Sequence, residues 1–273
     1  MTAARELAER PSARVLTILK RVGLILGLPV VLVAAWWFAS AGSTEFYQPP
    51  LSRIIEVFPK TWTGQRILDD VVPSLGRFAV GFLLAVAAGI ALGVAIGGNK
   101  ALRSFFEPVL EFLRAIPPPV LVPILILMAG IGNNQKVLVI VSGAIWPVLL
   151  NTIEGVRSVD PVQVDTCLSY RIRGALRLRT FILRSASPQI MTGVRQAQQI
   201  ALILMVISEL VAAENGLGYS IVQWQRGFQI PEMWSGVIVL GIIGVVLALL
   251  LRLVERRVLV WYDGVRAAER SAR

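Results

Sequence analysis

Long apolar runs divide this 273-residue chain, and they constrain its fold more than any other feature. A helix that crosses the roughly 30 Å hydrocarbon core of a membrane needs about 20 mostly apolar residues, and several runs approach that length. The chain is 55% hydrophobic with a mean hydropathy of +0.69, too high for an ordinary soluble domain. Strict alternation of apolar and polar residues, as in a β-barrel, is absent. The sequence therefore predicts an all-α, polytopic membrane protein.

Six apolar runs are interpreted as spans, at residues 22–41, 75–98, 104–131 with a proline break, 137–156, 188–213 and 234–255. The first run follows a long basic arm and contains Trp36 and Trp37, so we interpret it as a retained helix and not as a cleaved signal peptide. The predicted organisation is a basic N-terminal arm (1–21), a transmembrane domain (22–255) and a basic C-terminal tail (256–273).

Basic residues flank the apolar runs unevenly. Most of the 27 Lys and Arg residues fall in segments on one predicted side of the membrane. The other side carries only Arg53, Lys60, Arg66, Lys136 and Arg226. By the positive-inside rule the richer side is cytoplasmic. We therefore expect a multi-pass protein of the bacterial cell membrane with its N-terminus in the cytoplasm. This topology accounts for the net charge of +10 better than nucleic-acid binding does.

Catalytic and metal-binding chemistry is poorly represented. The chain has no histidine and a single cysteine, Cys167, which argues against zinc sites and an internal disulfide. The stretch GVAIGGNK has two glycines at phosphate-loop spacing, but Asn99 follows the second glycine where that motif needs lysine. An intramembrane enzyme is also disfavoured because no second membrane-embedded acid is evident near Glu209. We expect no catalytic residue, metal or cofactor in this chain.

Small residues recur every fourth position in the second predicted span. They fall along one helical face and let another helix approach closely. The stripe suits either packing within the chain or pairing with a second chain, and it comprises Gly81, Ala85, Gly89, Gly93 and Gly97.

Three consecutive prolines interrupt the third predicted span. Pro117, Pro118 and Pro119 remove backbone donors and must bend or break the helix. Broken helices at membrane depth are tolerated where they face protein or a water-filled cavity, so the prolines are candidates for shaping a transport path. A packed kink without a transport role is the alternative. Arg114, just before them, is a further pathway candidate.

Glu209 lies near the end of an otherwise apolar span. Intramembrane acids usually face the bundle interior and mark functional sites. The structural alternative is pairing with Arg195 or with a backbone donor. The residues Asn215, Gly216 and Gly218 follow in a predicted external turn, and we group them with Glu209 as candidates for an external gate. The residues by themselves favour a plain connecting turn.

The longest predicted cytoplasmic loop, residues 158–185, begins with helix signals. Asp160 is a good N-cap, Pro161 suits the first helical position, and Gln163 follows at capping-box spacing. Gly174 is expected to separate two short helices.

Three stretches resemble the permease subunits of binding-protein-dependent ABC importers: LRAIPPPVLVPILILMAGIG, GVRSVDPVQVDTCLSYRIRGALRLRTFILRSASPQI and SELVAAENGLGY. The likeness is strongest to the sulfonate, taurine and nitrate branch and runs from about Pro49 to Leu251. The resemblance implies a type I importer-like bundle of about six transmembrane helices. It also implies a cytoplasmic coupling helix that inserts into an ATPase subunit.

The family's coupling motif has Glu-Ala-Ala, a Gly six residues after the Glu, and a later Leu-Pro. Aligned without gaps on Pro188 and Ile190, the Glu falls on Asp165, the Gly on Arg171 and the Pro on Arg184. The two Ala fall on Thr166 and Cys167. The departure predicts a strongly cationic docking surface suited to an acidic groove. The expected docking residues are Asp165, Thr166, Cys167, Ser169, Arg171, Arg173, Gly174, Arg177 and Arg184.

The resemblance implies a permease that works as a pair, homodimeric or heterodimeric, with two ATPase subunits and an external solute-binding protein. ATP and Mg²⁺ would then be bound by the ATPase chains, and the cargo would be a small organic anion such as a sulfonate or carboxylate. The weak coupling motif suggests a heterodimer with a more typical permease. An ion-coupled secondary transporter without an ATPase is the alternative, although no convincing repeat supports it.

Overall fold

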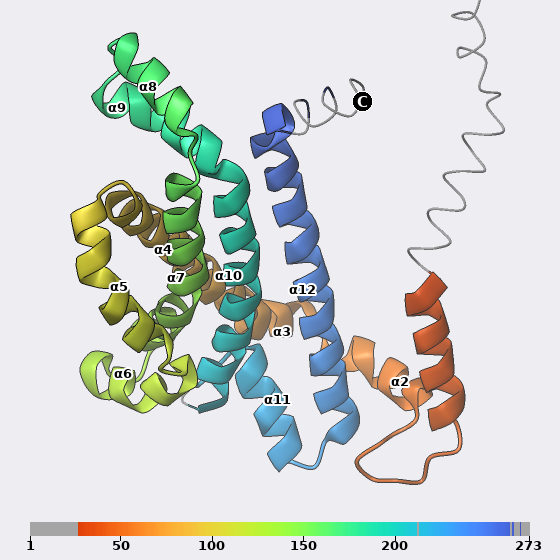
Figure 1. Ribbon diagram of the computed structural model, residues 1–273. Coiled ribbons are helices and arrows are strands. Elements are labelled where there is room, and N and C mark those ends of the chain that lie inside the picture. The colour runs from red at the N-terminus through yellow and green to blue at the C-terminus, as the bar shows by residue number, and fades with distance from the viewer. Residues whose placement is uncertain (1–26, 212, 263, 265–267, 269–273) are drawn as a thin grey trace, which may run out of the picture.

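The computed structural model describes residues 27–211, 213–262, 264 and 268. The predicted N-terminal arm (1–21) and most of the C-terminal tail beyond Tyr262 lie outside these residues. Every regular element in the described part is helical, as Figure 1 shows. The main helices are Gly27–Ser40, α2 (Leu51–Thr61), α4 (Val72–Gly97), α5 (Lys100–Arg114), α6 (Val122–Ala129), α7 (Asn133–Arg157), α8 (Pro161–Ser169), α10 (Leu183–Val211), α11 (Leu217–Arg226) and α12 (Ile230–Val258).

Shorter elements join these helices. The turn α3 (Gly64–Arg66) and a π-helical turn, η1 (Ile67–Val71), lead without a break into α4. A 3₁₀ turn, η2 (Pro118–Leu121), precedes α6. Before α10 come α9 (Gly174–Arg177) and a second π-helical turn, η3 (Leu178–Ile182).

The core of the bundle is formed by α4, α7 and α10, which lie side by side in Figure 1. The small-residue stripe of α4 faces α7. A Cβ atom built on Gly93 would lie 2.5 Å from the Cβ of Thr152, and one built on Gly81 would lie 2.7 Å from a methyl group of Ile140. Since real side chains do not approach so closely, the helices pack in this register only because these positions lack a side chain. The stripe therefore serves packing within the chain.

The proline run breaks the third predicted span. Pro117 is extended, with φ −63° and ψ 123°, and α5 and the segment Pro118–Ala129 meet at 83°. Without their N–H groups the prolines cannot continue the hydrogen-bond ladder of α5. Arg114 ends α5 and forms an exposed ion pair with Glu111 at 2.5 Å. The predicted helix break is thus present, and α6 turns back toward the start of α7.

The long helices overlap the predicted spans, and each begins a few residues earlier than predicted. Four continuous helical stretches are long and apolar enough to cross a membrane, and the bent α5–α6 pair makes a fifth. The helix Gly27–Ser40 is shorter in its described part. The largest differences are at the start of α10, which begins at Leu183 where residue 188 was predicted, and at the end of α12, which continues to Val258. Lys136, counted above as external, lies inside α7 and is buried.

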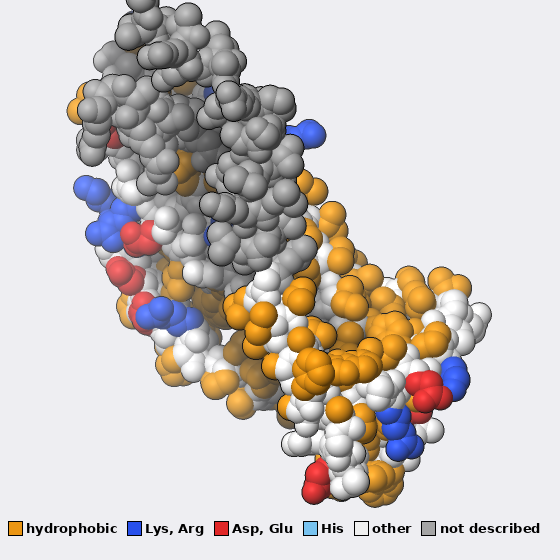
Figure 2. Space-filling view, turned by 90° about the vertical axis from the view of Figure 1, so that its right-hand side faces the viewer, with side chains coloured by type: hydrophobic (Ala, Val, Ile, Leu, Met, Phe, Trp, Pro, Cys, Tyr) orange, Lys and Arg blue, Asp and Glu red, His pale blue; other side chains and the backbone are white. Residues whose placement is uncertain are grey.

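The periphery consists of α12, α2 and the helix Gly27–Ser40. The amphipathic helix α2 begins at Leu51, where the proline before it fixes the backbone, and the indole N–H of Trp62 just after it donates to the Ser235 hydroxyl at 3.0 Å. None of the most apolar 18-residue window of α12 is buried. Figure 2 shows the broad hydrophobic surface on this side, with acidic and basic side chains at its margins. Such a surface fits lipid or another membrane helix.

Residues 158–185 form a projecting loop that carries α8 and α9 away from the end of the bundle where α7 ends and α10 begins. The carboxylate of Asp160 accepts the backbone N–H of Val162 at 2.9 Å, so the predicted N-cap is present. A break at residues 170–173 separates the two helices, as expected near Gly174, whose φ is +59°.

Candidate functional site

A buried ion pair joins two core helices at the end of the bundle opposite the projecting loop. Arg77, in the second turn of α4, and Glu209, near the end of α10, lie with Nη1 and Oε1 2.7 Å apart. Arg77 is 6% exposed and Glu209 1%. Two charges at this depth must find partners, because an unpaired one would carry a desolvation cost of several kcal/mol.

Hydrogen bonds from two further residues, Ser74 and Gly218, complete the set of partners of the Glu209 carboxylate. The Ser74 hydroxyl, one turn before Arg77, lies 2.8 and 2.9 Å from the two carboxylate oxygens. The backbone N–H of Gly218 donates to the same carboxylate at 3.0 Å. One arginine, one hydroxyl and one peptide group therefore occupy the carboxylate, as the high cost of an unsatisfied buried acid requires.

Arg77 is equally well partnered. Its Nε donates to the side-chain oxygen of Asn133 at the start of α7 at 2.8 Å. Its Nη1 donates to the backbone carbonyl of Asn215 at 3.0 Å, and its Nη2 donates to the Asn215 side chain. The guanidinium thus ties α4 to α10, to α7 and to the turn that follows α10. Its five donors in a planar fork suit this role better than a lysine would.

The turn itself is closed by a second buried acid. The Asp70 carboxylate accepts the backbone N–H of Gly216 at 3.1 Å and the hydroxyl of Ser220 at 2.7 Å, and it pairs with Arg66 at 2.9 Å. The N–H of Leu217 donates to Ser74 at 2.9 Å. The first N–H groups of α11, which have no partner within the helix, are satisfied by these side chains from α4 and η1.

The glycines of the turn are required by this arrangement. Gly216 has φ +119°, and a Cβ there would lie 2.5 Å from the Glu209 carboxyl carbon. A Cβ on Gly218 would lie 2.8 Å from the Cβ of Glu209. The segment Asn215–Gly218 is therefore more than a plain connecting turn: it closes over the acid. We call Asp70, Ser74, Arg77, Glu209 and residues 215–218 the outer cluster.

Sequence reasoning found half of this cluster. It singled out Glu209, Asn215, Gly216 and Gly218, which the structure brings together. Of the two structural partners suggested for Glu209, the backbone donor is present at Gly218, but Arg195 was wrong. Arg195 pairs with Glu255 of α12, and the partner of Glu209 is Arg77. Asp70, which is 5% exposed and binds the same turn, was not singled out because it precedes the predicted span 75–98. An intramembrane arginine in the second predicted span was the available signal, since such charges usually pair with one another.

A small cavity of about 210 Å³ adjoins the outer cluster. It lies between the Gly132 turn, the start of α7 and the turn after α10, and both Arg77 and Lys136 line it. Lys136 is 3% exposed and donates to the Gly132 carbonyl at 3.1 Å. Among the described residues no group of three or more acidic, cysteine or histidine side chains is placed to hold a metal ion.

The other candidate region is the projecting loop. Asp165, Thr166, Ser169, Arg171, Arg173, Gly174 and Arg184 are exposed, Arg177 is half-buried and Cys167 is buried. Arg171, at the position where the importer motif has glycine, has φ +57°. The loop thus keeps the left-handed backbone that a glycine favours, with an arginine side chain in its place. Tyr170 and Leu176 are also exposed, at 77% and 59%.

Comparison with known proteins decides between the classes of transporter. Residues 85–260 match the family described as binding-protein-dependent transport system inner membrane component. The chain belongs to this family. It is a membrane-spanning permease subunit of an ABC importer, with the ATPase on a separate chain, and the alternative of an ion-coupled secondary transporter is set aside.

Individual relatives agree with this assignment. The chain is 29% identical to the putative aliphatic sulfonates transport permease protein SsuC of Bacillus subtilis, over 90% of this chain and 91% of that one. It is 28% identical to the taurine transport system permease protein TauC of Escherichia coli, over 90% and 92%. Among solved structures, the chain is similar to a chain of the MetNI methionine ABC transporter in an inward-facing conformation, with a TM-score of 0.58. The match covers 71% of this chain and 94% of the matched chain. At 16% identity that match supports the fold alone.

Proposed function

We propose that this permease is driven by an ATPase that docks on the projecting loop, and that the outer cluster holds its external side. The observation that carries the proposal is the loop itself. Two short helices stand clear of the bundle, joined directly to the core helices α7 and α10. A force applied to α8 and α9 is therefore passed to the two helices that make up most of the core.

The chemistry of the loop suits a protein partner. Arginines on its surface lie next to exposed apolar side chains, Val162, Tyr170 and Leu176. Tyr and Arg are enriched at protein interfaces, where a buried aromatic group and a bidentate cation act together. An acidic groove on the ATPase would complement the positive charge. The orientation that follows places this end in the cytoplasm and the outer cluster at the external face, in agreement with the distribution of Lys and Arg.

Transport would follow the alternating-access scheme. Two permeases, two ATPases and an external solute-binding protein form the assembly, and ATP with Mg²⁺ is bound by the ATPases. Their closure pulls the projecting loops together and rocks the two bundles about a central path. Arg77 and Glu209 keep α4, α7, α10 and α11 together as one rigid unit at the external end. The broken helix α5–α6 borders the path, since its side chains are largely unburied within the chain.

The cargo is proposed to be a small organic anion, such as a sulfonate or a carboxylate. The names of SsuC and TauC support this class, because both refer to sulfonated compounds. The second permease is either a copy of this chain or a relative with a more typical loop. The departure of Arg171 and Arg184 from the motif favours the second arrangement.

Copurification tests the docking step. The double variant Arg177→Glu and Arg184→Glu reverses two charges of the loop and should abolish copurification of the ATPase. Membrane insertion and yield should stay unchanged, because both side chains lie outside the bundle core. Lys100→Glu with Arg103→Glu, at the same end of the bundle but on α5, is the matched control and should retain the ATPase. Retention of the ATPase by the loop variant would refute the docking assignment.

A further inference from the structure

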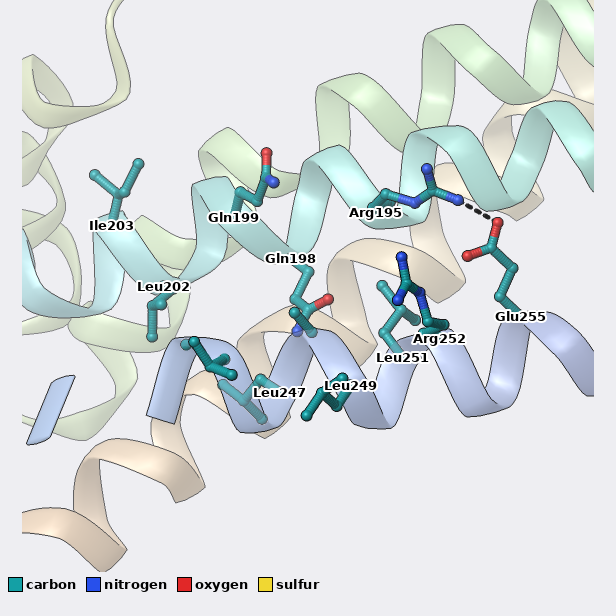
Figure 3. A pocket seen from close by; sticks show the side chains of 13 residues that line it. Arg195, Gln198, Gln199, Leu202, Ile203, Leu247, Leu249, Leu251, Arg252 and Glu255 are labelled. Carbon is teal, nitrogen blue, oxygen red and sulfur yellow. Dashed lines mark hydrogen bonds and ion pairs between the residues drawn. The ribbon is translucent and has the colours of Figure 1, made fainter. Parts of the chain in front are cut away.

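A cleft separates α10 from α12 in the half of the bundle nearest the projecting loop. Its volume is about 610 Å³, within the range of small-molecule sites, and Figure 3 shows the side chains that line it. One end is polar, with Arg195 and Gln198 from α10 facing Arg252 and Glu255 from α12. The remainder is apolar, with Leu202, Val245 and Leu249 among its lining residues.

Donor groups in this cleft lack acceptors. Arg195 pairs with Glu255, as the dashed line in Figure 3 marks. In the described part of the chain, however, Arg252 makes no ion pair or hydrogen bond. Gln198 is 8% exposed, and its amide makes no hydrogen bond to any described residue. The Arg252 guanidinium is exposed and the Gln198 amide lines the same cleft, so both are free to donate to an anionic group that enters it.

The charge and the position of the cleft identify the partner as anionic and amphipathic. Two arginines against one glutamate leave an excess positive charge. Arg252 and Glu255 lie in the last two turns of α12, where the helix approaches the membrane surface at the projecting-loop end. A second cavity, closer to that end, is lined by Arg179 of η3, Arg184 of α10 and Arg257 of α12. Basic pockets between transmembrane helices on the cytoplasmic side are typical sites for anionic lipid headgroups.

A helix of a second copy fits less well. The helix Gly27–Ser40 is one exposed apolar element that a second copy offers for such a contact, but residues 27–40 contain no acidic side chain. It would leave Arg252 and Gln198 without partners inside an interface, which is costly. A phospholipid supplies both a phosphate for these donors and acyl chains for the apolar surface of α12.

We propose that this cleft binds an anionic phospholipid, with the phosphate between Arg252, Gln198 and Arg195 and the acyl chains along Val245 and Leu249. The lipid fills the gap between α12 and the core and holds α12 against α10. The inference rests on the proposed orientation, which places the polar end of the cleft in the cytoplasmic leaflet.

Native mass spectrometry of the full-length chain in detergent, with phosphatidylglycerol and phosphatidylcholine added in equal amounts, tests the site. The wild-type chain should retain phosphatidylglycerol preferentially. Arg252→Gln should lower the retention of phosphatidylglycerol about fivefold. Adding Gln198→Leu to that variant should lower the retention further. Neither change removes a hydrogen bond or an ion pair within the described protein, so both variants should still fold. Arg103→Gln, on α5 at the same end of the molecule, is the control and should behave like the wild type.

Two results would overturn the proposal. One is equal retention of the two lipids, or retention that Arg252→Gln does not change. The other is an intermolecular disulfide between Val33→Cys and Leu249→Cys in a Cys167→Ser background, which would show that a helix of a second copy covers the cleft. The lipid experiment requires neither the ATPase nor the solute. A negative lipid result therefore does not bear on ATPase docking, and a negative docking result does not bear on lipid binding.

Discussion

Arg77 on α4 and Glu209 on α10 meet at 2.7 Å in a site from which solvent is almost fully excluded, although 132 positions separate them in the chain. Each also binds the turn after α10, so one ion pair fixes three segments. Pairs of this kind contribute little net stability compared with apolar side chains of the same size, but removing one partner leaves a buried charge.

The first prediction concerns the difference between removing one partner of the Arg77–Glu209 pair and removing both. Arg77→Met or Glu209→Gln alone should destabilise the protein by about 3–5 kcal/mol, whereas the double variant should cost less than the sum of the two. Thermal unfolding of the purified protein measures the difference. Lys60→Met, which removes the exposed Glu56–Lys60 pair, is the control and should change little. Single variants no less stable than this control would contradict the role assigned to the outer cluster.

The second prediction concerns Gly216. Gly216→Ala adds a methyl group 2.5 Å from the Glu209 carboxyl carbon, at a residue with φ +119°. The backbone strain is on the order of 1–3 kcal/mol, and the displaced carboxylate adds to it. A clear fall in the unfolding temperature should result. Gly76→Ala, on α4 where no atom lies within 4 Å of the added carbon, should be neutral or slightly stabilising. Equal effects of the two substitutions would show that the turn does not close on Glu209.

Arg171 permits a test of loop shape separate from loop charge. Arg171→Val places a β-branched residue at φ +57°, while Arg173→Val removes the same charge at an extended residue with φ −129°. If the left-handed bend presents α8 to the ATPase, Arg171→Val should weaken ATPase binding several-fold more than Arg173→Val does. Arg171→Gly should preserve binding. Titration of the purified permease with ATPase measures all three, and similar losses for the two valine variants would show that charge alone matters.

Much of the fold could be predicted from the sequence, because a chain in lipid needs long apolar helices whose breaks and ends depend on local residues. Span length, the proline break at Pro117–Pro119 and the N-cap at Asp160 each depend on local chemistry, and each is present in the structure. The stripe from Gly81 to Gly97 also identified a close helix contact. It did not identify α7 as the partner, because small side chains allow any helix to pack closely and do not specify which one does.

The candidate site was only partly accessible because its pairings are long-range. Glu209 stood out as an acid in an apolar run, but its partner could not be chosen from composition. Arg195 is nearer in sequence and on the same helix, yet fourteen residues along a helix correspond to roughly 20 Å, too far for an ion pair. Asp70 was missed since it precedes the apolar run and became buried only through the fold of η1 and α11.

The central claim is that the projecting loop is the surface on which the ATPase docks. Photo-crosslinking tests it most directly, with benzoylphenylalanine in place of Tyr170, which is 77% exposed on that loop. The same group in place of Phe46, which is 54% exposed and packs against Phe228 in the turn between α11 and α12, is the control. The account predicts a crosslink to the ATPase from position 170 and none from position 46. A crosslink from position 46, or none from position 170 in a complex that retains the ATPase, would contradict it.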